Sequence, residues 1–200
     1  GGGGGAGVGG GRRRVSSVGG EGSSGGPTGV AVRSQGGSPV DAVAATYFGL
    51  AVPYPAAAGL GGGGICIVYD ATTGQSEEFD FLARDASGGG AYATPGNVRG
   101  FALMQSLHGA IPWQRDVSPG EGYAATGFPI SRALSLQLAQ TKDAIRGDAG
   151  LAAELLDEGG VVKPEGAVVS NPQLAQTLAA VRVRGLEGLY KGDIGARIIA

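Results

Sequence analysis

Few side chains in this sequence could act as nucleophiles, and they are widely separated. His108 is the only histidine and Cys66 the only cysteine among 200 residues. A cysteine beside a histidine can serve as a nucleophile, because the imidazole favours the thiolate. Cys66 lies inside the apolar run 65–69, where a cysteine usually serves packing, and His108 stands at a predicted helix end before Gly109. Structural roles are therefore favoured, and a Cys66–His108 pair is the less favoured alternative.

Two glycine-rich segments match the pattern G-x-G-x-x-G, namely residues 5–10 (GAGVGG) and 59–64 (GLGGGG). Dinucleotide binding requires a strand before the glycines and a helix after them, so that the helix N-terminus meets the pyrophosphate. Here a predicted helix precedes Gly59 and a predicted strand follows Gly64, and no Walker-type lysine is present. The sequence therefore does not predict a nucleotide site.

Composition narrows the function classes further. One histidine and one cysteine do not make a credible zinc site, no paired carboxylates stand out, and no cofactor is implied. The formal net charge of -2 gives no electrostatic reason to expect nucleic acid or an anionic membrane as partner. An arginine cluster at residues 12–14 could touch nucleic acid, but it is typical of a solvated tail.

The elements that would position functional groups follow from caps and periodicity. Ser38 is a good N-cap, Pro39 suits the first helical position, and apolar residues from Val40 onward have helical spacing until Pro53. Residues 42–69 carry no charge, but prolines and glycines interrupt them too early for a membrane span. We expect a buried core helix. Residues 65–69 and 75–82, separated by a polar turn that ends at Gly74, predict a β-hairpin.

The remaining sequence predicts mainly helices, with caps or first residues at Val98, Ser131, Asp148, Asn171 and Asp193. The last of these helices has no stop signal, which predicts a truncated domain. The 42 glycines are about a fifth of the chain, against a usual share of roughly 7%. Many of them lie near the start, so residues 1–28 are predicted to be a disordered tail and residues 29–200 the folded part.

Five blocks in order resemble the γ-glutamyltranspeptidase family, in the N-terminal part of its large subunit. Residues 36–42 are similar to its G-G-N-A-V-D-A opening, with Ser38 in place of asparagine, and residues 59–70 to its G-I-G-G-G-G-F-M-L-V-Y-D segment. The blocks are 36–42 (GGSPVDA), 59–70 (GLGGGGICIVYD), 94–101 (TPGNVRGF), 109–131 (with GAIPW, Pro119 and GFPIS), and 171–178 with 189–192 (NPQLAQTL and LYKG).

The resemblance implies an α+β fold, mainly helical with a β-hairpin, that forms part of the αββα sandwich of N-terminal-nucleophile hydrolases. Its implied activity is transfer or hydrolysis of γ-glutamyl amides such as glutathione, by a threonine freed at the N-terminus of a small subunit. That nucleophile is expected beyond residue 200, so no catalytic residue is assigned and the chain alone is expected to be inactive. The threonines present lie in none of the family's nucleophile motifs: Thr28, Thr46, Thr72, Thr73, Thr94, Thr126, Thr141 and Thr177.

One substrate-binding residue carries over from the resemblance. The family binds the substrate α-carboxylate with an arginine after the second strand, in a pattern like D-x-R-E-x-A-P. The corresponding stretch here is residues 80–87 (DFLARDAS), and Arg84 is the candidate, one residue out of register and without the proline. A planar guanidinium suits bidentate binding of a carboxylate. The alternative for Arg84 is a surface arginine paired with Asp85, and Arg99 would then be the next candidate for the carboxylate clamp. The alternatives for the function of the chain are a segment of a related amide acylase or an inactive truncated product.

Overall fold

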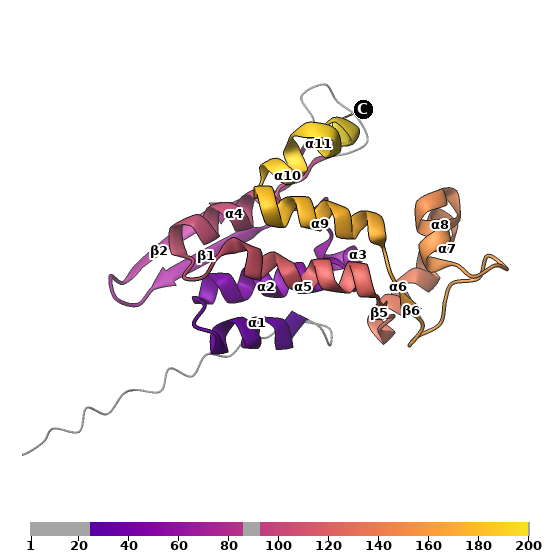
Figure 1. Cartoon of the computed structure of the whole chain (residues 1–200), viewed down its shortest axis with the longest axis horizontal. Helices are drawn as coiled ribbons and strands as arrows, with labels where there is room; N and C mark the ends of the chain where they lie inside the picture. The colour runs from indigo at the N-terminus through magenta and orange to yellow at the C-terminus, as the bar shows by residue number, and fades with distance from the viewer. Residues whose placement is uncertain (1–24, 86–92, 200) are drawn as a thin grey trace, which may run out of the picture.

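The computed structural model describes residues 25–85 and 93–199, and helices dominate the part it describes (Figure 1). The helices are α1 (Gly25–Ser34), α2 (Pro39–Ala51), α3 (Pro55–Ala58), α4 (Asn97–His108), α5 (Trp113–Thr126), α6 (Arg132–Gln140), α7 (Lys142–Gly147), α8 (Ala149–Leu155), α9 (Pro172–Arg184), α10 (Glu187–Tyr190) and α11 (Gly192–Ile199). The strands are β1 (Ile65–Asp70), β2 (Gln75–Asp80), β3 (Arg84–Asp85), β4 (Ala93–Thr94), β5 (Phe128–Pro129) and β6 (Val168–Val169). The predicted α+β class, mainly helical with a hairpin, is confirmed.

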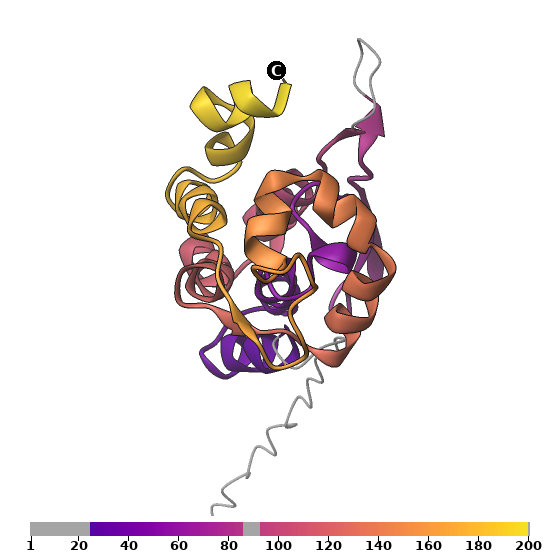
Figure 2. The same ribbon diagram turned by 90° about the vertical axis from the view of Figure 1, so that its right-hand side faces the viewer.

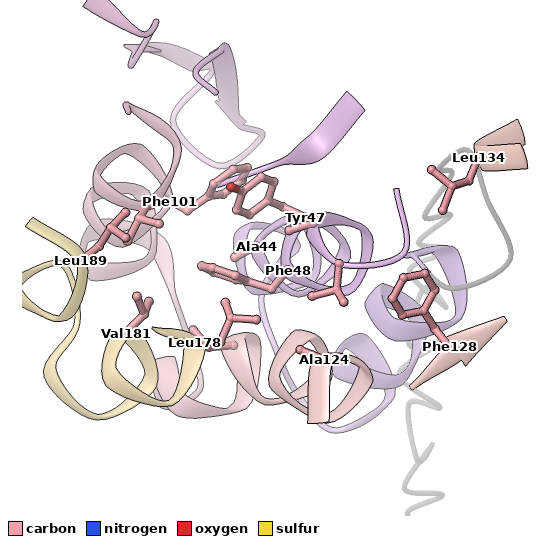
Figure 3. Close-up of a cluster of buried hydrophobic side chains, with 14 of the residues drawn as sticks. Ala44, Tyr47, Phe48, Phe101, Ala124, Phe128, Leu134, Leu178, Val181 and Leu189 are labelled. Carbon is pink, nitrogen blue, oxygen red and sulfur yellow. The ribbon is translucent and has the colours of Figure 1, made fainter. Parts of the chain in front are cut away.

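Four helices form the body of the molecule. α1, α2, α5 and α9 lie side by side in that order, and Figure 2 shows them nearly end-on. Gly120 lets α5 approach α2 closely, since a Cβ there would overlap the carbonyl oxygen of Phe48. Phe48, Leu178 and Val181 are fully buried among these helices (Figure 3). Burial of such side chains supplies most of the favourable free energy of folding.

The predicted cap of α2 is confirmed and forms a reciprocal capping box. The Ser38 hydroxyl accepts the backbone N–H of Asp41 at 3.1 Å, and the Asp41 carboxylate accepts the backbone N–H of Ser38 at 2.6 Å. Two otherwise unpaired backbone donors at the helix start are thereby satisfied. The predicted caps Ser131, Asp148 and Asn171 are confirmed for α6, α8 and α9, where each side chain accepts one backbone N–H without a reciprocal bond.

Helix α5 was not predicted, and its composition explains why. It contains Pro119 in its interior and glycines at 120 and 122, residues that weaken an isolated helix. Tertiary contacts compensate for this, because Val117 and Ala124 are fully buried and the indole N–H of Trp113 donates to the carbonyl of Val181 at 2.9 Å. Packing between α2 and α9 therefore outweighs the weak local propensity.

The predicted hairpin is confirmed as an antiparallel pair, β1 with β2, in which Ile65 lies opposite Asp80 and Asp70 opposite Gln75. Asp70 organises the turn, because its carboxylate accepts the backbone N–H of Thr72 at 2.8 Å and its carbonyl accepts that of Gly74. Gly74 has φ of 71°, a left-handed conformation that glycine adopts without strain. β3 pairs with β4, and β5 pairs with β6, each antiparallel.

Residues 1–24 of the predicted glycine-rich tail (residues 1–28) lie outside the described residues. Residues 25–28 do not fit that prediction, because they form the first turn of α1. Val32 in α1 is buried against the core, so the helix packs although its sequence is poor in strong helix formers. Among the residues that the structure describes, no helix is long and apolar enough to cross a lipid bilayer.

One face of the hairpin carries apolar side chains that nothing in the described chain covers. Ile65, Ile67 and Tyr69 alternate along β1 and are 56%, 68% and 63% exposed. The opposite face packs on the core through Phe79, which is 6% exposed. On the exposed face, β2 places Asp80, Glu78 and Ser76 opposite the three β1 residues, so the exposed apolar surface is a stripe along β1. Such a stripe favours association with another surface.

We therefore expect the 200-residue chain to self-associate at micromolar concentration, or to bind a hydrophobic dye. Ile67→Ser should reduce either effect by removing the most exposed apolar side chain of that face. Analytical ultracentrifugation with and without the substitution measures this. A monodisperse wild-type monomer that binds no dye would contradict the expectation.

Candidate functional site

Arg84 lies at the start of β3, directly after the hairpin, on an arm formed by β3 and β4 that extends away from the stacked helices (Figure 2). Its side chain is 64% exposed, and its Nη2 donates to Oδ2 of Asp80 at 2.6 Å. The expected surface alternative was a pair with Asp85, and the structure places Asp80 there instead. An exposed ion pair of this kind contributes at most about 1 kcal/mol, so Arg84 can exchange Asp80 for another carboxylate at little cost.

The chain between β2 and Arg84 is held at several points. Oδ1 of Asp80 accepts the backbone N–H of Leu82 at 3.0 Å, which shapes the bend after β2. The N–H of Phe81 donates to the carbonyl of Gly64 at 2.9 Å, and the Phe81 ring lies 5.5 Å from that of Phe101. The arm therefore leaves the core from a fixed position three residues before Arg84.

Glycines 63 and 96 allow two other backbone segments to lie against this bend. A Cβ at Gly63 would lie well inside 3.0 Å of backbone atoms of residues 81–83, and one at Gly96 would overlap the carbonyl oxygen of Phe81. The carbonyl of Gly62 accepts the N–H groups of Gly96 and Asn97 at 2.9 and 3.0 Å. The loop 59–64 follows α3 and precedes β1, the reverse of the nucleotide-binding order, and it serves close packing beside Arg84.

Gly63→Ala is expected to destabilise the chain by at least about 1 kcal/mol, because the new methyl group meets backbone atoms that cannot rotate away. Gly61→Ala is the matched control, since a Cβ there has no atom within 4 Å. Urea denaturation of both variants measures the difference. Equal midpoints for the two variants would show that the loop does not constrain the bend.

Arg99, the alternative carboxylate clamp, lies in the first turn of α4 and is exposed. Its backbone N–H donates to the hydroxyl of Tyr190 at 3.3 Å. Arg84 lies opposite Thr94 in the β3–β4 pair, and Thr94 precedes Arg99 by five positions in the chain.

Cys66 and His108 are not arranged as a nucleophile and its base. His108 Nε2 pairs with Oε2 of Glu77 at 2.8 Å, and its ring meets the Phe79 ring edge-on at 5.9 Å. Cys66 lies opposite Phe79 in the hairpin, and burial raises the pKa of its thiol. A raised pKa disfavours the thiolate, so the structure supports the packing role for Cys66 and a helix-terminal role for His108.

Two buried carboxylates are a feature that the sequence analysis missed. Asp41 of α2 and Asp116 of α5 are both fully buried, and neither oxygen of Asp116 has a hydrogen-bond partner among the described residues. Oδ2 of Asp41 accepts N–H groups of Ser38 and Ala110 at 2.6 and 2.8 Å. Burial, and then the charge of Asp41, raises the pKa of Asp116 to about 8. Asp116 is therefore protonated at neutral pH.

The sequence indicates only one of these two carboxylates. Asp41 is recognisable as a capping-box residue, but Asp116 lies 75 positions later in a helix that was not predicted. Within residues 25–85 and 93–199, no group of three or more histidine, cysteine, aspartate or glutamate side chains could hold a metal ion.

A groove of about 690 Å³ lies where α8 meets the start of α9, and two of its polar groups, on Glu154 and Asn171, bond to each other. The Asn171 amide donates to Glu154 at 2.6 Å, and Lys163 donates to the Glu154 carbonyl at 2.7 Å. Burial raises the pKa of Glu154. These hydrogen bonds stabilise the junction between the helices.

A family profile described as Gamma-glutamyltranspeptidase matches residues 26–200. Among curated proteins, Glutathione hydrolase 2 of Arabidopsis thaliana is 34% identical over 187 residues, covering 86% of this chain and 32% of that protein. The Glutathione hydrolase proenzyme of Pseudomonas sp. (strain A14) is 29% identical over 194 residues, covering 86% of this chain and 33% of the proenzyme. The chain thus spans about a third of the length of these relatives.

Solved structures give the same picture of the fold. The γ-glutamyltranspeptidase of Helicobacter pylori superposes with a TM-score of 0.88 at 23% identity, covering 92% of this chain and 59% of that one. The γ-glutamyltranspeptidase of Pseudomonas nitroreducens, complexed with L-DON, superposes with a TM-score of 0.80 at 26% identity over the same shares. The fold is therefore part of that of an N-terminal-nucleophile hydrolase.

Proposed function

This chain belongs to the γ-glutamyltranspeptidase family, and we propose that it forms the substrate-positioning part of an enzyme that hydrolyses or transfers γ-glutamyl groups. The observation that carries the proposal is Arg84. Its exposed guanidinium already holds a carboxylate at 2.6 Å, near the base of the β3–β4 arm. Arginine is suited to this task because its fork of N–H donors matches the two oxygens of a carboxylate.

In the proposed reaction, Arg84 binds the α-carboxylate of the γ-glutamyl donor and so orients the distant γ-amide. The donor carboxylate replaces that of Asp80, an exchange that costs little because the existing pair is exposed. Orientation of this kind lowers the activation free energy by removing rotational freedom before the chemical step.

The nucleophile of the proposed enzyme is a threonine at the N-terminus of a small subunit, supplied by the family segment that follows this region. Its hydroxyl attacks the γ-carbonyl carbon while its own α-amine accepts the hydroxyl proton. That proton passes to the leaving amine as the amide C–N bond breaks, which leaves a γ-glutamyl ester on threonine. Water or the amine of an amino acid then attacks the ester and releases the threonine.

The exposed apolar side chains along β1 suggest that a second chain packs on the hairpin in this enzyme. Ile65, Ile67 and Tyr69 are exposed in the described chain, and a second sheet packed on them would bury the face as in a β-sandwich. We propose that the small subunit provides this cover.

Activity should depend on the nucleophile segment. The 200-residue chain alone is expected to release no product from a γ-glutamyl amide such as glutathione, whereas the same chain followed by the family segment that carries the threonine should cleave itself and release glutamate. Mass spectrometry of the cleaved subunits and a glutamate assay measure both steps. Release of glutamate by the 200-residue chain alone, above the level of an identically purified control, would contradict the proposal.

A further inference from the structure

Tyr190 connects two parts of the chain that are far apart in sequence, helix α10 and the start of α4. Its hydroxyl donates to the carbonyl oxygen of Pro95 at 2.9 Å and accepts the backbone N–H of Arg99 at 3.3 Å. The side chain is partly buried, and burial raises the pKa of its hydroxyl. The neutral hydroxyl therefore makes both hydrogen bonds across the physiological pH range.

The bond from the Arg99 N–H caps a helix start that has no side-chain cap of its own, and the bond to Pro95 fixes the residue before Gly96. The residue before α4 is Gly96, which has no side chain to accept the first N–H groups of the helix. Those N–H groups have no partner within a helix and need one outside it. Tyr190 supplies to α4 from another helix what Ser38 supplies to α2 from the adjacent position.

The segment that Tyr190 holds is the one that lies against the base of the arm. Gly96 packs so closely on the carbonyl of Phe81 that a Cβ would overlap it. The N–H groups of Gly96 and Asn97 also donate to the carbonyl of Gly62, in the loop that borders the same bend. A shift of residues 95–99 would therefore move the point from which the chain leaves toward Arg84.

Helix α10 is a firm support for the Tyr190 side chain. Gly188 lies where a Cβ would overlap backbone atoms of Ala180 in α9, so the two helices are in close contact. Leu189 is 4% exposed and packs into the central core (Figure 3). The hydroxyl thus reaches α4 from a packed element and not from a loose loop.

We propose that Tyr190 is a positioning residue for Arg84, acting through Pro95, Gly96 and Phe81. This inference rests on the proposed role of Arg84 in binding the donor carboxylate. The Tyr190 hydroxyl would fix the geometry of the β3–β4 arm whether or not Arg84 binds a donor, so the structural part can be tested separately.

The test is amide hydrogen exchange in the 200-residue chain carrying Tyr190→Phe, which removes the hydroxyl and keeps the ring. Loss of a hydrogen bond costs enough free energy to raise local opening by roughly threefold to tenfold. We expect that increase at the amides of Phe81, Gly96 and Asn97, with unchanged exchange at buried amides of α2.

Tyr54→Phe is the matched control, since the Tyr54 hydroxyl also has a hydrogen bond, from the amide of Gln137 at 2.9 Å. It should leave Phe81, Gly96 and Asn97 unaffected. If Tyr190→Phe accelerates only the Arg99 amide, the hydroxyl caps α4 and does nothing for the arm. If it accelerates exchange throughout the chain, its role is general stability. Either result would overturn the inference.

A kinetic measurement separates this inference from the proposed function. In the active form that carries the threonine segment, Tyr190→Phe should raise KM for a γ-glutamyl donor by roughly threefold and leave kcat nearly unchanged, because the arm is looser but Arg84 is intact. If Arg84→Lys proves silent in the same assay, the proposed function fails, while the exchange data still decide whether Tyr190 positions the arm.

Discussion

The contribution of Asp116 to the stability of the 200-residue chain is expected to decrease as pH rises from about 4 to about 8, because Asp116 must give up a proton in the core. The pKa of Asp116 is raised from 3.8 to about 8 in the folded chain, by burial and then by the charge of Asp41. The folded state therefore binds a proton that the unfolded state releases across this window. The contribution is greatest below pH 4, decreases by up to about 1.4 kcal/mol per pH unit, and is lost above pH 8.

The charged groups on the helices around α5 do not compensate for the free-energy cost of ionising Asp116 in the core. Asp41 approaches from α2 with the same sign of charge. From α9, Arg182 pairs with Glu121, which lies in α5 beyond Asp116. From α1, the guanidinium of Arg33 donates to the carbonyl of Gly37. Among the described residues no cation pairs with Asp116, so the neutral carboxyl is its stable form in the fold.

Asp116→Asn tests this directly, because the amide has a similar shape and no charge at any pH. Relative to wild type, the free energy of unfolding of the variant should rise by on the order of 4 kcal/mol between pH 5 and pH 8.5. Urea denaturation across this range measures it, with Asp143→Asn as control because that side chain is 85% exposed. Parallel pH profiles for wild type and Asp116→Asn would show that Asp116 is ionised in the fold.

In an active form that carries the threonine segment, Arg84→Lys is expected to lower kcat/KM for a γ-glutamyl donor by about ten- to a hundredfold. Lysine keeps the charge but cannot make the bidentate pair, and loss of a charge-assisted hydrogen bond costs roughly 1.5–3 kcal/mol. Self-cleavage should remain intact, because that step uses the threonine and not the donor site. Steady-state kinetics and the ratio of cleaved to uncleaved chain measure the two effects.

Arg99→Lys is the matched control for this substitution, since Arg99 is also exposed and belongs to the neighbouring element α4. A silent Arg84→Lys together with a large effect of Arg99→Lys would move the clamp to Arg99. Silence of both substitutions would mean that neither arginine binds the donor.

Much of the fold could be predicted from sequence, because local chemistry specifies it. The caps at Ser38, Ser131, Asp148 and Asn171 are short-range signals that depend on two or three neighbouring residues, and each is confirmed. The hairpin followed in the same way from its strands and from the turn that Gly74 closes.

The elements that were missed depend on contacts between distant segments. Helix α5 contains Pro119 and two glycines, and it is stable because Val117 and Ala124 fill the space between α2 and α9. The start of α1 at Gly25 was likewise assigned to a flexible tail, because glycine content was the only local signal there.

The candidate site shows the same division. Arg84 could be proposed from a motif, but its partner Asp80 depends on the bend after β2 and was not foreseen. Asp116 lies 75 residues from Asp41, whose charge helps to raise its pKa. Tyr190 lies 91 residues from Arg99, whose backbone N–H donates to the Tyr190 hydroxyl. Only the three-dimensional arrangement of the helices brings such residues together.

The most direct test of the account compares two donors that differ only in the α-carboxylate, a γ-glutamyl amide and its decarboxylated 4-aminobutanoyl analogue. Both are assayed with wild-type and Arg84→Lys forms that carry the threonine segment. If Arg84 binds the α-carboxylate, the substitution should reduce kcat/KM by about ten- to a hundredfold for the first donor and by less than about twofold for the second. Equal losses for the two donors would contradict a role for Arg84 in carboxylate binding, and with it the proposal that this chain positions a γ-glutamyl substrate through that residue.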